Sequence, residues 1–138
     1  MTHQWVANGF CIGFMTKRGV VLDLDNMTEK KATLKAELLL KRYRLEGYLL
    51  IRSSEKSYHV VFNKYLRWRT ITKILFSLYE CIRYAVFQMK EGFLTLRISR
   101  KNGKDKPKIL IAVGKQDKLI KDYFEAYEMA EKFEIEML

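Results

Sequence analysis

The sequence predicts one α/β (α+β) domain in which strands and helices follow one another in the order β-α-β-β-α-β. A chain of 138 residues, with 49% hydrophobic and 30% charged residues, can bury one core and is short for two domains. Short apolar runs typical of strands are separated by two longer segments with helical spacing. We therefore expect a single domain over residues 1–138, with an extra hairpin strand at its start and a helix at its end.

The N-terminal part predicts a hairpin. Apolar residues run over 5–14, the turn-like residues 16–19 follow, and residues 20–25 (VVLDLD) are typical of a buried strand. We expect the first and last of these segments to pair.

A helix is predicted from about Thr28 to Arg44. Thr28 is a suitable N-cap, and Gly47 is expected to end the helix. Its apolar positions recur at roughly helical spacing: Leu34, Leu38, Leu39 and Leu45.

The middle of the chain predicts a second hairpin and a second helix. Residues 48–53 and 57–62 resemble strands joined by the polar turn 54–56. A helix over about 68–87 presents apolar residues on one side, and residues 93–99 form a strand. The apolar residues of that helix are Ile71, Ile74, Leu75, Leu78, Ile82 and Ala85.

The last third of the chain contains a basic turn over 100–106, a strand-like segment over 108–113 and a helical pattern over 116–137. The order over 20–99 is that of a ferredoxin-like or RNA-recognition-like sheet with two helices on one face. The other face is then free for function.

Charge indicates the class of partner. Lys and Arg number 26 against 16 Asp and Glu, a formal net charge of +10, which favours nucleic acid. The most apolar later segment, 71–89, carries Lys73, Glu80 and Arg83, so we expect no membrane span. Cys11 and Cys81 are the two cysteines and have no second pair beside them, so neither their count nor their spacing supports a disulfide framework or a thiolate zinc site, which favours a cytoplasmic, intracellular location.

Asp23 and Asp25 are the first candidate site residues. Side chains two apart on a strand share a face, and two carboxylates there repel each other unless a cation lies between them. Oxygen ligands favour Mg²⁺ or Mn²⁺. The alternative is a polar strand end, with Asp25 capping the next helix.

Ser57 and His59 are the second pair of candidates. On their strand they face one way with Val61, while Tyr58 and Val60 face the other. A histidine in a strand is more often a partly buried ring with a satisfied hydrogen bond, and that alternative stays open for His59.

Together these segments resemble the first two motifs of the archaeo-eukaryotic primases and related primase-polymerases, hydrophobic-Asp-x-Asp and Ser-x-His. The resemblance covers about residues 20–63. It implies that Asp23 and Asp25 hold the catalytic metal and that Ser57 and His59 contact the phosphates of a nucleoside triphosphate, with His59 part of the catalytic set. It also implies single-stranded or primer-template DNA as substrate, and a larger primase or helicase subunit as a further partner in DNA replication.

The sequence departs from the pattern of that family at the third motif. The family places another Asp on a later strand, whereas residues 93–99 offer Thr95, Arg97 and Ser99. Arg97 stands where the carboxylate is expected, and Glu91 and Asp105 lie near the ends of that strand. Nucleotidyl transfer therefore stays open beside a non-catalytic role.

The rival interpretation is an RNA-recognition-like protein that binds single strands without catalysis. Residues 56–62 partly match the basic and aromatic signature of that fold. Tyr58 would then face the nucleic acid and His59 the core, so the two hypotheses predict opposite faces.

Basic side chains are the expected nucleic-acid and phosphate contacts. Arg52 and Arg97 are expected to reach a triphosphate. Trp68 between two arginines is more often a staple into the core than a stacking platform. The predicted nucleic-acid contacts are Arg67, Arg69, Arg100, Lys101, Lys104 and Lys106.

Overall fold

A computed structural model describes residues 3–8, 11–101 and 103–137. Its strands are β1 (His3–Asn8), β2 (Cys11–Thr16), β3 (Gly19–Leu24), β4 (Gly47–Ser54), β5 (Ser57–Tyr65), β6 (Leu94–Arg97) and β7 (Lys108–Gly114). Its helices are α1 (Glu29–Tyr43), α2 (Trp68–Phe76), the 3₁₀ turn η1 (Tyr79–Cys81), α3 (Ile82–Glu91) and α4 (Leu119–Met137). The mixed α+β class and the C-terminal helix are confirmed.

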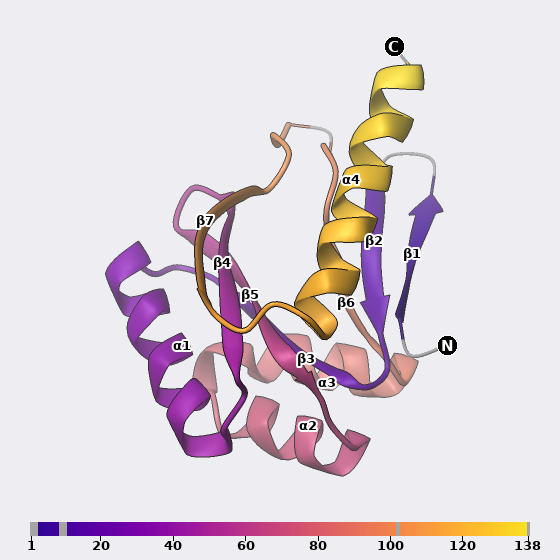
Figure 1. The fold of residues 1–138 in the computed structure, drawn as a ribbon. Coiled ribbons are helices and arrows are strands. Elements are labelled where there is room, and N and C mark those ends of the chain that lie inside the picture. Colours follow the sequence, from indigo (N-terminus) through magenta and orange to yellow (C-terminus); the bar gives the residue numbers. More distant parts are fainter. Residues whose placement is uncertain (1–2, 9–10, 102, 138) are drawn as a thin grey trace.

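The strands form two antiparallel sheets, in the orders β1-β2-β6 and β3-β5-β4-β7 (Figure 1). The β-α-β-β-α-β order holds along the chain, but the expected single sheet is divided. β6 pairs with β2, from Thr16↔Leu94 to Gly13↔Arg97, and the Ile98 N–H donates to the Ile12 carbonyl at 2.9 Å. The free edge of β4 is taken by β7.

The N-terminal hairpin also differs from the prediction. β2 pairs with β1, and β3 pairs with β5. The Thr16 hydroxyl accepts a hydrogen bond from the Gly19 N–H at 3.0 Å, which closes the turn between β2 and β3. This turn leads the chain from one sheet into the other, so the two segments expected to pair belong to different sheets.

Helix α1 begins as predicted, because the Thr28 hydroxyl accepts a hydrogen bond from the Lys31 N–H at 3.2 Å. It ends at Arg44, whose φ of 51° is left-handed, and not at Gly47. Gly47 opens β4, where a Cβ atom would collide with the Lys115 carbonyl oxygen. Of the predicted apolar positions, Leu39 and Leu45 are buried, but Leu34 and Leu38 are exposed.

The second predicted helix is two helices. The Ser77 hydroxyl donates to the Ile74 carbonyl at 2.6 Å, and Leu78 adopts an extended conformation that ends α2. η1 and α3 then follow. Ile71, Ile74 and Leu75 are buried as expected, whereas Ile82 is exposed.

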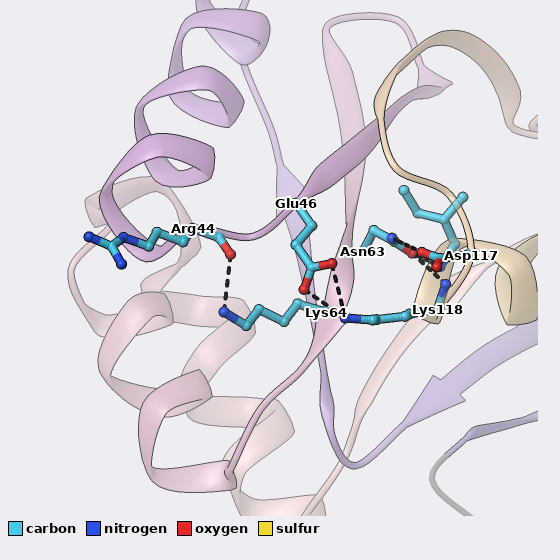
Figure 2. A network of polar contacts seen from close by, with 7 residues as sticks. Arg44, Glu46, Asn63, Lys64, Asp117 and Lys118 are labelled. Carbon is cyan, nitrogen blue, oxygen red and sulfur yellow. Dashed lines mark hydrogen bonds and ion pairs between the residues drawn. The ribbon is translucent and has the colours of Figure 1, made fainter.

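The sheet face expected to be free is covered by α4, which lies on the side of the four-stranded sheet opposite α1 (Figure 1). Asn63 of β5 fixes the start of α4 (Figure 2). Its Oδ1 accepts from the Lys118 N–H at 2.8 Å and the Ile120 N–H at 3.3 Å, and its Nδ2 donates to Asp117 Oδ1 at 2.9 Å. A strand side chain thus supplies the cap that a helix usually takes from its own N-terminus.

None of the described helices is both long enough and apolar enough to cross a bilayer.

Candidate phosphate-binding site

Asp23 and His59 lie opposite each other on neighbouring strands. They are register partners in the β3–β5 pair, so their side chains share the face on the α4 side of the sheet. Asp23 Oδ1 lies 3.8 Å from His59 Nε2, beyond hydrogen-bond length. The predicted convergence of these two motifs is present in the fold.

Both groups are largely buried, and burial shifts the pKa of each toward its neutral form. Burial, and then the neighbouring Asp25, raise the pKa of Asp23 to about 6, although Arg97 and Lys104 act to lower it. Burial, and then Arg97 and Lys104, lower the pKa of His59 to about 3. At neutral pH the contact therefore joins a carboxylate to a neutral imidazole. The buried Nδ1 of that imidazole has no hydrogen-bond partner among the described residues.

Arg97 reaches the same place from β6, in the other sheet. Its Nη2 donates to the Ser53 carbonyl at 2.6 Å, and its Nη1 donates to the carbonyls of Asp105, at 2.8 Å, and Ser99. Its charge acts on both Asp23 and His59. Arg97, which the sequence interpretation set against a third carboxylate, thus acts on the site as a positive charge held by three carbonyl oxygens.

Lys104 brings the basic turn to the site. The backbones of Lys101 and Lys104 exchange two hydrogen bonds, of 3.1 and 2.7 Å, which close the tip of the turn. The charge of Lys104 acts on the same two groups, Asp23 and His59. From the sequence, Lys104 was expected only to contact nucleic acid, and its position on the basic turn was the available signal.

Asp25 lies next to Asp23, and Ser57 lies next to His59. β3 ends at Leu24, so Asp25 is exposed beyond the strand, yet it lies near enough to raise the pKa of Asp23. Asp25 does not cap α1, because Thr28 does. Ser57 shares the face of His59 two residues earlier on β5.

The donor set at this site suits at most one metal ion. Asp23 and Asp25 repel each other, and a divalent cation between them would relieve that repulsion. Over the described parts of the chain, however, no group of three or more His, Cys, Asp or Glu side chains could hold a metal. Arg97 occupies the position from which a third carboxylate would come.

Arg52 does not reach the site. It alternates with the buried Ile51, which is the register partner of His59, so Arg52 lies on the opposite face. There it pairs with Glu29 of α1, with Nη2 to Oε1 at 3.5 Å. The expectation that Arg52 contacts the triphosphate is therefore wrong for this conformation.

One of the expected nucleic-acid contacts, the Lys106 side chain, has another structural role, whereas Arg100 contacts α4 through its backbone N–H and the prediction for its side chain stays a prediction. Lys106 Nζ lies 3.0 Å from Glu131 Oε2 and 3.9 Å from the centre of the Tyr127 ring, so this side chain joins the basic turn to α4. The Arg100 N–H donates to Glu134 Oε1 at 3.1 Å. The exposed Arg67 and Arg69 begin α2, in the helical layer that includes α1, and Trp68 packs against the core.

Tyr58 separates the two sequence hypotheses. It is only 4% exposed and lies on the α1 face, whereas the RNA-recognition alternative requires an open Tyr58. His59 is 5% exposed and shares its face with Asp23. Alternation along β5 thus places the histidine, and not the tyrosine, at the polar site.

Three residues around the site were not predicted from the sequence. Cys81 Sγ donates to the Asp23 carbonyl at 3.5 Å, and the Tyr84 hydroxyl donates to the Thr95 carbonyl at 3.0 Å. Tyr123 of α4 is fully buried, and this burial raises the pKa of its hydroxyl, although the charge of Arg97 acts to lower it. None of the three belongs to a motif.

Comparisons of the chain with protein-family models, with curated proteins and with solved structures find no match.

Proposed function

We propose that this protein is a divergent primase-polymerase relative that binds nucleic acid and the phosphates of a nucleoside triphosphate, and that its role in replication is binding more than synthesis. The observation that carries the proposal is the convergence of Asp23, His59 and Arg97 from three strands of two sheets. These are the positions of the three motifs in the resemblance. A cytoplasmic location and a larger primase or helicase partner belong to the same proposal.

The charges at the site favour phosphate. Arg97 is held in place by three carbonyl oxygens, and Lys104 stands beside it on the basic turn. A guanidinium that is already fixed loses little freedom when a phosphate binds. One Mg²⁺ or Mn²⁺ ion at Asp23 and Asp25 would supply the remaining positive charge toward the phosphates.

The same charges oppose efficient nucleotidyl transfer. A two-metal centre needs carboxylates that bridge its ions, and Arg97 replaces one of them with a positive group. We therefore expect weak or partner-dependent incorporation of nucleotides.

The test measures three quantities on one set of variants. Binding of the Mn²⁺–nucleoside triphosphate complex is followed by electron paramagnetic resonance, template binding by fluorescence anisotropy, and synthesis by incorporation of a labelled nucleotide. The double variant Asp23→Asn with Asp25→Asn is compared with Asp105→Asn, which changes an exposed carboxylate on the basic turn.

We expect the double variant to lose Mn²⁺–nucleotide binding and to keep template binding, and Asp105→Asn to keep both. Unchanged Mn²⁺–nucleotide binding in the double variant would refute the site. Efficient synthesis by the wild-type protein alone would refute the non-catalytic role, and equal losses of nucleotide and template binding would mean that the aspartates support the fold instead.

A further inference from the structure

The helical layer exposes an unusual number of large apolar side chains. Tyr79 is 86% exposed and Phe87 61% exposed, although neither belongs to the phosphate site. The patch, called here the helix patch, consists of Leu34, Leu38, Phe76, Tyr79, Ile82, Val86, Phe87 and Met89. An exposed apolar surface of this kind marks a protein interface more often than a solvated face.

The parts of the helix patch are held together. Leu34 and Leu38 lie on the side of α1 that also carries Lys31 and Lys35. Lys35 Nζ lies 2.7 Å from Glu80 Oε1, directly beside Tyr79 of η1. The chain then continues into α3, whose outer side carries the remaining residues of the patch except Phe76 of α2.

The charge around the helix patch identifies its partner as acidic. The four helical elements α1, α2, η1 and α3 contain nine Lys and Arg against four Glu. Arg83 and Lys90 lie between the apolar side chains on the exposed side of α3. An acidic helix with apolar side chains of its own would match this surface in both respects.

Helix α4 of this chain has those properties. It contains six acidic residues against two lysines. Of the six, Glu131 and Glu134 contact the basic turn of their own chain, and three others are exposed and stay available to a partner. Its later turns expose Met129 and Ile135, the latter to 64%. Those turns extend past the strands, at the end of the molecule away from α2 and α3 (Figure 1). The helix therefore cannot reach the helix patch of its own chain.

We propose that the helix patch of one copy binds the exposed side of α4 from a second copy, so that chains associate head to tail. Two different surfaces meet in such a contact, and it repeats into a ring or a filament instead of stopping at a symmetric dimer. Its ionic part weakens as salt rises.

The test uses two variants at exposed positions. The patch variant is Val86→Glu with Phe87→Glu, and the α4 variant is Met129→Lys with Ile135→Lys. A third variant, Lys115→Glu, changes charge at an exposed position outside both surfaces. Circular dichroism confirms folding, and sedimentation velocity measures mass from micromolar concentrations to about 1 mM.

We expect the wild-type protein and Lys115→Glu to grow in mass with concentration, and each of the two double variants alone to keep the mass of one chain. An equimolar mixture of the two double variants should form a species of two chains and no larger, because one intact patch meets one intact α4. A wild-type protein that stays at the mass of one chain would overturn the proposal and leave the patch to another protein. Self-association of the α4 variant alone would overturn it in favour of contact between two patches.

Discussion

Asp23 Oδ1 and His59 Nε2 stand 3.8 Å apart across the β3–β5 pair, which is too far for a direct hydrogen bond. The two side chains differ in burial, since that of Asp23 is 33% exposed and that of His59 only 6%. Burial disfavours the charged form of both groups, so it raises the pKa of the acid Asp23 and lowers that of the base His59.

His59 should make the protein less stable in acid. Its pKa is about 3 in the fold against a usual value of 6.5, so between these values the unfolded chain binds the proton and the folded chain does not. The free energy of unfolding then falls as pH drops through this window. Chemical denaturation of His59→Gln between pH 3 and pH 7 should show a smaller fall than the wild type; an equal fall would show that His59 is not the titrating group.

Asp23 should make the protein more stable in acid, the opposite of the effect of His59. Its pKa is about 6 in the fold against a usual 3.8, so the folded chain binds the proton more readily and the free energy of unfolding falls as pH rises from about 4 to 6. Because the side chain is one-third exposed, we expect Asp23→Asn to stabilise the protein at pH 7 by only about 1 kcal/mol. Thermal melts at pH 4 and pH 7 test this, since the gain should vanish at the lower pH.

Arg97 should be a structural residue in addition to its proposed contact with phosphate. Arg97→Ala leaves the carbonyls of Ser53, Ser99 and Asp105 without this donor, and we expect a loss of about 2–3 kcal/mol in the free energy of unfolding. Arg97→Lys keeps the charge but lacks the planar guanidinium, so it should recover only part of that loss. Full stability in Arg97→Lys would mean that charge alone matters at this position.

We expect Lys101 and Lys104 of the basic turn to contribute to the binding of single-stranded DNA, and Lys106 to contribute to stability instead. Lys101→Glu with Lys104→Glu should reduce the slope of log affinity against log salt by about 0.7 for each phosphate that the protein no longer neutralises. Lys106→Glu should leave that slope almost unchanged and lower the melting temperature, because Lys106 pairs with Glu131 and covers Tyr127. Equal salt slopes for the double variant and the wild type would place the nucleic-acid surface elsewhere.

Gly47 should not tolerate a side chain. A Cβ atom there would collide with the backbone of Val113 and Lys115, so Gly47→Ala requires β4 and β7 to separate. We expect a loss of about 2 kcal/mol or more, measured by urea denaturation. Gly103→Ala is the matched comparison, because open space surrounds Gly103 and its φ of 78° adds only local strain. A smaller loss at Gly47 than at Gly103 would contradict the close approach.

Local signals in the sequence predicted most of the helices and strands, but they could not predict how distant segments pair. Thr28 capped its helix as predicted, and alternation along residues 57–62 put Tyr58 and His59 on opposite faces, since both features depend on neighbouring residues. The partner of residues 94–97 depends on which strand edge is free, and no periodicity encodes that. β6 therefore joined β2 against expectation.

The candidate site was predictable in part, because some of its residues also stand in local sequence patterns. The carboxylates and the histidine stand in short motifs, whereas Arg52 was expected at the triphosphate only for its charge, although alternation sends it to the α1 face. The contribution of Tyr123 was not predictable at all. Its position under the sheet follows from the path of a helix that begins more than fifty residues after β5.

Helix α4 contacts both sheets, since Tyr123 packs edge-on against Phe14 of β2 with ring centres 5.4 Å apart, and Asn63 of β5 fastens the start of the same helix. During synthesis the ribosome delivers residues 23, 59 and 97 well before residues 119–137. Until that last segment has emerged, α4 cannot pack against the two sheets. The nascent chain then contains all three site residues but lacks the helix that holds the two sheets together. Translation thus completes the candidate site last, and a chain arrested before α4 would expose His59 and Arg97 to water.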